Sequence, residues 1–209
     1  MQFTKSLLAA ASLFAAVSGA VVPQFQYVPQ HNGTTNGTTN GTAPALPADA
    51  KFQLMSLRSA SPVHFSRFQA AKGSIFLQLP SQNATCDSED TGAATFYLKD
   101  GGLYLYAASA TPQQLYADRS GMGQGNLGYT TGAQPGPRNG ERTGWTIDSY
   151  GDLTLDGAGF LACPNSIEGA WSIWVSAGIN NPAGNTGCLG ISVRAVQINE
   201  PNSCSYTSS

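Results

Sequence analysis

Hydrophobic and polar residues alternate with a period close to two from Phe52 towards the end of the chain. Turn-forming residues interrupt the alternation roughly every eight to twelve positions, which is the pattern of short strands joined by tight turns. No segment shows the 3.6-residue period of an amphipathic helix. The pattern predicts an all-β domain, with strands at 52–58, 64–69, 74–79, 95–99, 103–107, 113–117, 145–148, 153–155, 160–163, 171–177 and 189–198.

The segment 96–106 predicts a β-hairpin in a defined register. Its apolar side chains occupy even positions before Asp100-Gly101 and odd positions after it. Both sets can face the core only if the loop has an even number of residues, and Asp100-Gly101 suits a two-residue type I′ turn. The opposite face of the hairpin then carries three tyrosines, Tyr97, Tyr104 and Tyr106.

The expected architecture is a single antiparallel β-sandwich or barrel within residues 50–209. The segments 96–105 and 145–155 share one plan, in which two apolar positions, a polar turn with glycine and a Leu-x-Leu pair follow each other. A repeat of this kind would also suit a β-trefoil, which stays open as an alternative fold. Two dissimilar copies do not decide between these folds, and the sandwich or barrel is the commoner architecture.

Residues 1–20 have the pattern of a secretory signal peptide. The single cation Lys5 precedes an apolar run of about eleven residues, which is too short to span a membrane. Ser18 and Ala20 supply the small residues of a signal-peptidase site, so cleavage is expected after Ala20. The polar stretch 202–209 lacks the hydrophobic tail of a glycolipid-anchor signal. We therefore expect a secreted, extracellular protein with no membrane partner.

Residues 21–49 show no periodicity and contain three consecutive Asn-Gly-Thr repeats among several prolines. This composition predicts a disordered stalk that precedes the β domain. Each repeat is also an Asn-x-Thr sequon, and a fourth sequon lies inside the β domain. The candidate N-glycosylation sites are Asn32, Asn36, Asn40 and Asn83.

The chain contains four cysteines, and an even number of cysteines in a secreted protein predicts disulfide bonds. Four cysteines allow three different pairings. Cys163 and Cys188 lie in neighbouring strand-like segments, which favours a bond between them and leaves Cys86 to bond with Cys204. No Cys-x-x-Cys pair is present, so a zinc site is not expected.

Charged residues make up only 11% of the chain and nearly balance, at a net charge of −2. A chain with this balance offers no basic surface to nucleic acid, so that partner is not expected. His64 is the only histidine of the predicted domain, where it falls in a predicted strand, and no Gly-x-Ser-x-Gly motif accompanies it. We therefore predict no catalytic residue, no metal site and no cofactor.

Paired carboxylates are the remaining route to catalysis, as in glycoside hydrolases. The acidic residues of the domain lie mostly in polar loops and turns, where short carboxylates bond to backbone N–H groups. A hydrolase would need two of them to converge in a cleft. The candidates for such a pair are Asp87, Glu89, Asp90, Asp148, Asp152 and Asp156.

Aromatic side chains suggest a binding function, because an exposed ring can stack on the apolar face of a sugar. Core packing is the commoner use of such residues, and we expect it for Trp145 and Trp171. The candidate sugar-stacking residues are Tyr97, Tyr104, Tyr106 and Trp174.

Four short motifs follow one another between residues 53 and 197. They are Leu-Arg-Ser-Ala-Ser-Pro-Val-His-Phe at 57–65, Gly-Phe-Leu-Ala-Cys-Pro at 159–164, Trp-Ser-Ile-Trp-Val-Ser-Ala at 171–177 and Cys-Leu-Gly-Ile-Ser-Val-Arg-Ala-Val at 188–196. In these motifs the sequence resembles the fungal phialide-type cell-wall proteins, a family that includes IgE-binding allergens.

The resemblance implies a secreted, glycosylated and non-enzymatic wall protein of a filamentous fungus, linked to the development of spore-bearing cells. It transfers no catalytic residue to this chain. The partners that it implies are cell-wall polysaccharide or other wall proteins. A carbohydrate-binding module is the second hypothesis for function and a glycoside hydrolase is the third.

Overall fold

The computed structural model describes residues 45–108 and 110–208. The expected signal peptide, most of the expected stalk and the sequons at Asn32, Asn36 and Asn40 lie outside these residues.

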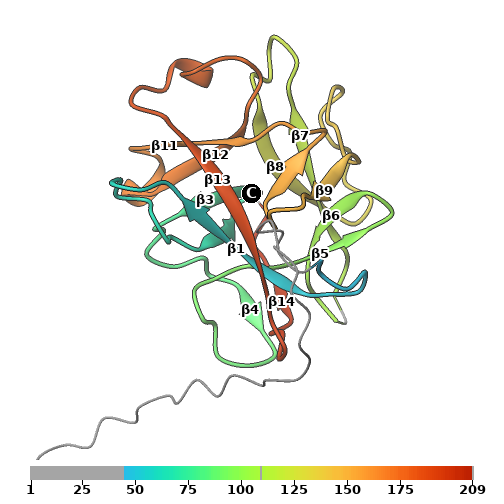
Figure 1. Ribbon diagram of the computed structural model, residues 1–209. Coiled ribbons are helices and arrows are strands. Elements are labelled where there is room, and N and C mark those ends of the chain that lie inside the picture. The colour runs from blue at the N-terminus through green and yellow to red at the C-terminus, as the bar shows by residue number, and fades with distance from the viewer. Residues whose placement is uncertain (1–44, 109, 209) are drawn as a thin grey trace, which may run out of the picture. The chain divides into compact units, whose positions relative to one another are not determined.

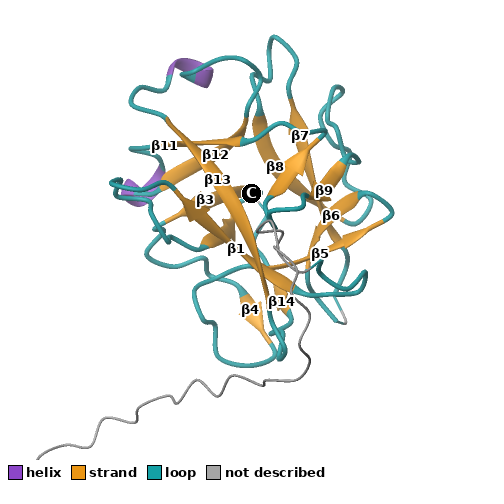
Figure 2. Ribbon diagram, viewed as in Figure 1, coloured by secondary structure: helices purple, strands orange, loops and turns teal. Residues whose placement is uncertain are grey.

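Regular structure in the described residues is β-strand, apart from two short 3₁₀ turns, η1 (Ile167–Gly169) and η2 (Pro182–Gly184) (Figure 2). The prediction of an all-β domain is confirmed. The strands are β1 (Phe52–Leu57), β2 (Phe68–Ala71), β3 (Ser74–Leu77), β4 (Thr85–Cys86), β5 (Thr95–Lys99), β6 (Gly102–Leu105), β7 (Gln113–Asp118), β8 (Asn126–Thr131), β9 (Trp145–Ile147), β10 (Leu153–Leu155), β11 (Phe160–Cys163), β12 (Trp171–Val175), β13 (Leu189–Gln197) and β14 (Cys204–Ser205).

The main sheet closes on itself as an antiparallel barrel (Figure 1). Its strands pair in the order β11-β13-β1-β5-β6-β7-β8-β12-β3-β2, and an additional pairing of β11 with β12 joins the two sides. β3 also pairs with β8, so it lies between β8 and β12 at one end of the barrel. Of the expected folds, the barrel is therefore the one that forms.

The weak internal repeat does not produce two equivalent units. Its first copy is the β5–β6 hairpin, which forms part of the barrel wall. Its second copy is β9 and β10, which pair only with each other as a separate two-stranded sheet. The similarity of the two segments reflects a shared hairpin pattern, and the trefoil alternative loses its support.

The alternation along β1 shows how the barrel buries its apolar side chains. Phe52, Leu54 and Ser56 are buried, while the residues between them are half-exposed. Leu54 lies opposite Ala195 of β13, which is also buried, so both strands turn their apolar faces inward. Each Å² of apolar surface that is buried in this way stabilises the folded state by about 25 cal/mol. The largest fully buried side chains are Trp145, Phe52, Phe68, Phe96, Leu54, Ile75, Leu77, Leu103, Leu105, Leu115, Leu153 and Leu155.

The hairpin prediction is confirmed in register. Lys99 pairs with Gly102, which leaves Asp100-Gly101 as a two-residue turn. Both turn residues have positive φ, 51° at Asp100 and 72° at Gly101, as a type I′ turn requires.

The strand prediction at 64–69 was wrong at its start. Residues 59–65 form turns and a bend, and β2 begins only at Phe68. Phe65 has a φ of 62°, which is incompatible with a strand, and His64 therefore lies in a turn, where its Nδ1 accepts the Arg58 N–H at 3.1 Å.

β8 was not predicted from the sequence, because Gly128 interrupts its alternating pattern. That glycine is required by packing, since a Cβ there would lie 2.6 Å from the Tyr116 hydroxyl and 2.8 Å from the Gly73 carbonyl oxygen. The two-residue strands β4 and β14 were omitted as well, because a pairing this short leaves no periodic pattern.

Side-chain amides complete the barrel where strands end. Gln69 accepts the Leu79 N–H at 2.7 Å and donates to its carbonyl at 2.9 Å. Gln113 forms the same double contact with Tyr206, at 2.9 and 2.8 Å. The edge of β2 is covered in a related way, because Ala70 N–H donates to Gln82 at 3.3 Å and Ala94 N–H donates to the Phe68 carbonyl at 2.8 Å.

Two disulfides, Cys86–Cys204 and Cys163–Cys188, complete the fold, in the pairing expected from the sequence. The first joins β4 to β14 near the C-terminal end, and the second joins the end of β11 to the residue before β13.

Candidate functional site

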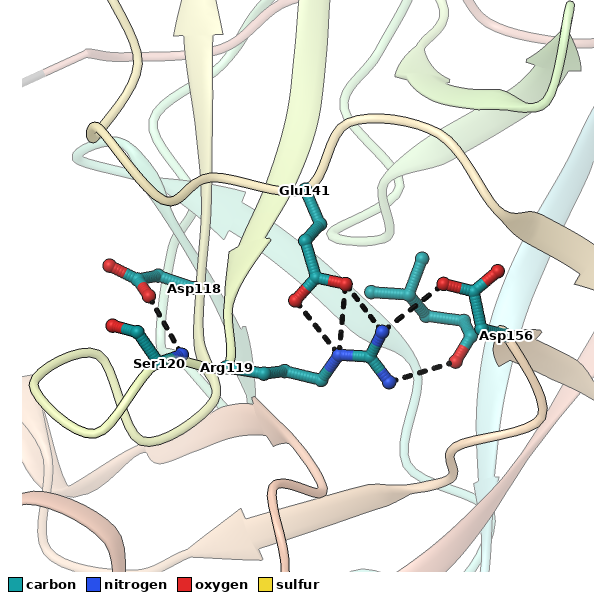
Figure 3. Close-up of polar contacts among 6 residues, drawn as sticks. Asp118, Arg119, Ser120, Glu141 and Asp156 are labelled. Carbon is teal, nitrogen blue, oxygen red and sulfur yellow. Dashed lines mark hydrogen bonds and ion pairs between the residues drawn. The ribbon is translucent and has the colours of Figure 1, made fainter.

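A cluster of charged side chains forms around Arg119, which directly follows β7 (Figure 3). Its Nε donates to Glu141 at 2.9 Å, and its Nη2 donates to Glu141 and, at 3.1 Å, to Asp156. The remaining nitrogen, Nη1, is 3.4 Å from the carbonyl oxygen of Leu155. One guanidinium therefore connects two loops and the end of β10.

Backbone hydrogen bonds hold the members of this cluster in place. Ala117 and Glu141 exchange two of them, at 3.0 and 2.7 Å, which fixes the Glu141 loop against β7. Asp156 N–H donates to the Gly144 carbonyl at 2.9 Å. Before the arginine, Asp118 accepts the Ser120 N–H at 3.0 Å and closes the turn (Figure 3).

The electrostatics of the cluster favour fixed charges. The hydrogen bond from Arg119 holds the pKa of Glu141 below its ordinary value, and the same bond raises the pKa of Arg119. A glycosidase acid needs the opposite shift, because it must hold a proton near neutral pH. Glu141 is thus suited to structural ion pairing and poorly suited to proton donation.

Other predicted acid candidates are also engaged by the fold. Asp152 pairs with Arg194 at 2.6 Å. Asp148 accepts the N–H groups of Tyr150 and Asp152, both at 2.9 Å. Asp90 accepts from Gln82 and from the Gly92 N–H, at 2.6 and 2.8 Å.

The last two acid candidates, Asp87 and Glu89, are exposed on the loop around β4. Within residues 45–108 and 110–208, no group of three or more histidine, cysteine or acidic side chains is arranged to hold a metal ion.

Three of the candidate sugar-stacking residues form one aromatic surface. Tyr97 and Tyr104 face each other across β5 and β6, with ring centroids 5.2 Å apart and ring planes at 20°. Tyr106 meets Tyr97 edge-on at 6.4 Å, and the Lys51 ammonium lies 5.2 and 5.5 Å from the Tyr97 and Tyr106 centroids. All three rings are half-buried, and we call this set the tyrosine surface.

Partial burial affects the chemistry of the tyrosine surface. It raises the pKa of Tyr97, and the neighbouring Tyr104 raises it further. The Tyr97 phenol therefore stays neutral in the pH range of a living cell, and it can donate and accept hydrogen bonds.

Trp174 does not belong to this surface. It lies on β12, and β7 and β8 separate this strand from β6 in the barrel. Its indole N–H donates to Ser172 at 3.0 Å. The structure thus brings three of the four predicted residues together and places the fourth elsewhere.

The two remaining tryptophans differ in burial. Trp145 is 1% exposed and stacks on Phe160 with ring centroids 6.4 Å apart, as expected for a core residue. Trp171 is only half-buried, so the prediction that it belongs to the core was wrong in part.

A cleft of about 880 Å³ lies beside the tip of the β5–β6 hairpin. Its walls come from residues 45–50, the hairpin tip at 98–101 and the segment 145–149. Leu46, Leu98 and Ile147 supply apolar surface. No sequence pattern predicted this cleft, because its walls are distant in the chain and share no motif.

Two carboxylates, Asp100 and Asp148, also line the cleft. Asp148 already accepts two backbone N–H groups, and Asp100 belongs to the hairpin turn. These contacts give both acids a structural role in the turns that border the cleft.

Comparison with known proteins gives consistent matches over the β domain. The family model described as PhiA-like secreted protein matches residues 52–207. Cell wall protein phiA of Aspergillus fumigatus is 59% identical over 161 residues, which cover 77% of this chain and 87% of that protein. The protein of the same name from Aspergillus niger is 56% identical over 171 residues, which cover 79% and 93% of the two chains.

A more distant relative, cell wall protein phiA of Arthroderma benhamiae, is 41% identical over 149 residues, with coverages of 68% and 80%. No solved structure matches the chain significantly. The described residues contain no helix that is both long and apolar enough to cross a membrane. The chain belongs to the PhiA-like secreted protein family and is, like these relatives, a secreted protein of the cell wall.

Proposed function

We propose that the protein is a structural, non-enzymatic component of the wall that serves the development of spore-bearing cells. The proposal that the protein is not an enzyme rests on one observation, which is that several of its acidic side chains are engaged in ion pairs and hydrogen bonds. Glu141 and Asp156 share the Arg119 guanidinium, Asp152 pairs with Arg194, and Asp148 bonds to backbone N–H groups. The developmental role is supported by the resemblance to phialide-type proteins, and the place of this component in the wall is supported by the relatives, which are named cell wall proteins.

Incubation of the purified, secreted protein with chitin, β-glucan and mannan tests the absence of catalysis. We expect no released oligosaccharide. Release that is abolished by Asp148→Asn, the candidate acid at the cleft, would contradict the proposal. The matched control is Asp87→Asn, which changes an exposed acid outside the cleft.

Deletion of the gene in the fungus of origin tests the developmental role. Fewer spore-bearing cells are expected, with unchanged hyphal extension, and the wild-type gene should restore them. A deletion strain with normal numbers of these cells would contradict the developmental role and leave the catalytic question unaffected.

The tyrosine surface favours a second function, binding of wall polysaccharide. The parallel, half-exposed rings of Tyr97 and Tyr104 can stack on sugar rings, while Lys51 can bond to hydroxyl groups. Loss of one stacked ring costs about 1.4 kcal/mol, which is roughly a tenfold loss of affinity.

Pull-down with insoluble glucan and chitin separates the two functions. If the tyrosine surface binds glycan, Tyr104→Ala weakens retention about tenfold, whereas the control Trp174→Ala leaves it unchanged. Equal retention of both variants would remove the binding function.

A further inference from the structure

We propose that Asn83 carries an N-linked glycan whose first sugar packs into a pocket beside this residue and covers a small hydrophobic cluster. This inference goes beyond the proposed function, because the glycan would stabilise the fold whatever the barrel does in the wall. It rests on the position of the sequon, on the pocket and on the order in which the chain is made.

In the sequon Asn83-Ala84-Thr85, Asn83 lies exposed in the segment that joins β3 to β4, and Thr85 is the first residue of β4. Asn83 has a φ of 50°, a left-handed conformation that asparagine tolerates better than most residues. Its side-chain oxygen accepts from the Ser81 hydroxyl at 3.2 Å. Its Nδ2, the atom that a glycan would modify, has no hydrogen bond to another described residue, so it is free to carry a sugar.

A pocket of about 370 Å³ begins at Asn83. Its apolar lining consists of Ala71, Leu79 and Ile167. Ala71 and Leu79 belong to a small hydrophobic cluster that is separate from the barrel core, and Ile167 packs against that cluster while remaining half-exposed. Because Ala71 and Leu79 are themselves buried, Ile167 supplies most of the surface that these three residues leave in contact with water.

The chemistry of the pocket fits an N-acetylglucosamine unit, which is the first sugar of an N-glycan. The apolar face of the pyranose and the acetyl methyl group match the half-exposed side chain of Ile167, which lies over the buried cluster that contains Leu79. Lys72, Glu168 and Thr207 also line the pocket and supply donors and acceptors for the sugar hydroxyls. The apolar and the polar groups of the sugar thus both have suitable contacts in the pocket.

A covalent link explains why this sugar occupies the pocket rather than a free ligand. A free monosaccharide would lose translational and rotational freedom on binding, and a shallow pocket of this size repays little of that cost. A sugar attached at Asn83 is already at the rim, so its effective concentration is high and weak contacts suffice.

The order of synthesis keeps the sequon accessible to the glycosyltransferase. Cys86 lies three residues after Asn83, but its partner Cys204 follows 118 residues later. β4 likewise pairs with β14, which is made near the end of the chain. The sequon therefore enters the secretory pathway before either the disulfide or the strand pairing can fold it.

Glycopeptide mass spectrometry of the secreted protein tests occupancy, and thermal unfolding tests the packing. Complete enzymatic removal of the glycan turns Asn83 into aspartate, so Asn83→Asp is the matched genetic control and preserves the tolerance of positive φ. We expect both forms to unfold about 3 °C below the glycosylated protein. Trimming to a single N-acetylglucosamine should retain the higher unfolding temperature, because that sugar fills the pocket.

A pocket variant tests whether the effect depends on contact. In Ile167→Ser, removal of the glycan should no longer lower the unfolding temperature, and Ile167→Ala replaces this variant if it is not secreted. Thr85→Ser keeps the sequon and should behave as wild type.

An unmodified Asn83 in the mass spectra would overturn the proposal. Equal unfolding temperatures for the glycosylated, trimmed and Asn83→Asp proteins would overturn it too, as would a glycan effect that survives in the pocket variant. None of these measurements depends on catalysis or development, so failure here is distinguishable from failure of the proposed function.

Discussion

Arg119 is the residue that joins two loops through ion pairs to Glu141 and Asp156. Its planar fork satisfies Glu141 and Asp156 together, which an ammonium group cannot do with the same geometry. Both carboxylates remain partly exposed, at 34% and 59%, so the pairing contributes modestly to stability.

Replacement of this arginine gives the first prediction. Arg119→Met should lower the free energy of unfolding by about 1 kcal/mol, because two carboxylates lose their partner, and Arg119→Lys should recover only part of the loss. Urea unfolding at low and high salt measures the effect. Arg138→Met, at an exposed position, is the control, and an equal loss in that variant would contradict the assigned role of Arg119.

Tyr206 gives a prediction about alkaline pH. Burial raises the pKa of its phenol to about 12, from an ordinary value of 10.0. A raised folded-state pKa means that the stabilising contribution is complete below about pH 10 and disappears as the pH rises towards 12. The unfolding temperature of the wild-type protein should therefore fall across this interval.

The variant Tyr206→Phe removes both the titration and the hydroxyl that accepts the buried Thr95 N–H at 3.0 Å. It should lose about 1–3 kcal/mol at neutral pH, because that N–H is left unsatisfied, and it should show a smaller alkaline decline than wild type. Tyr150→Phe, at an exposed position, should show neither change. An unchanged alkaline decline in Tyr206→Phe would show that another group controls it.

At the scale of elements, local patterns proved sufficient for some strands and not for others. The β5–β6 hairpin was predicted in register, because Asp100-Gly101 and the alternation on both sides are contiguous in sequence. β8 was not predicted. Its glycine, Gly128, is required because the side chain of Tyr116 on the neighbouring strand leaves no space for a Cβ, and the local sequence does not show this contact. Positions that depend on distant partners carry no local signal.

The same distinction applies to the candidate site. The tyrosine surface follows from hairpin register and could be predicted. The cleft and the Arg119 cluster join segments that are distant in sequence, so no motif marks them. Trp174 is a false positive. It was grouped with the tyrosines because of its residue type, but the strand order places it on a different part of the barrel.

Gly125 gives a prediction at the contact between β8 and β12. It has a φ of 98°, its carbonyl accepts the Val175 N–H at 2.8 Å, and a Cβ there would lie 1.9 Å from the Val175 carbonyl oxygen. Gly125→Ala should therefore cost at least about 3 kcal/mol and reduce secretion.

The matched control is Gly121→Ala in the same loop, where a Cβ would meet nothing within 4 Å. It should stay within about 0.5 kcal/mol of wild type. Thermal unfolding of the two secreted variants measures the difference, and similar unfolding temperatures would contradict the packing described for Gly125.

At the scale of the whole molecule, the two disulfides close loops of very different length. Cys86–Cys204 spans 118 residues and Cys163–Cys188 spans 25. From loop-closure entropy, the two disulfides are expected to add about 5 and about 3.5 kcal/mol to the free energy of unfolding. The first contributes more, because closing the longer loop removes more conformational freedom from the unfolded chain.

Replacement of each cysteine pair by serine should reproduce this order in urea unfolding. The variant without Cys86–Cys204 should be the less stable of the two, with its C-terminal segment opening first under limited proteolysis. The reverse order would mean that native packing around Cys163, which is fully buried, outweighs loop entropy.

The closure of the main sheet also decides how the protein can coexist with its neighbours in the wall. Open sheet edges expose rows of unpaired backbone groups that recruit strands from other chains, and crowding promotes such stacking into fibrils. Here the main sheet closes on itself. Along the last strand, β2, Gln82 and Ala94 form hydrogen bonds with backbone groups that would otherwise be unpaired. The main sheet therefore offers few unpaired backbone groups to a neighbouring strand, and we expect the barrel to contact its neighbours mainly through side chains or sugars.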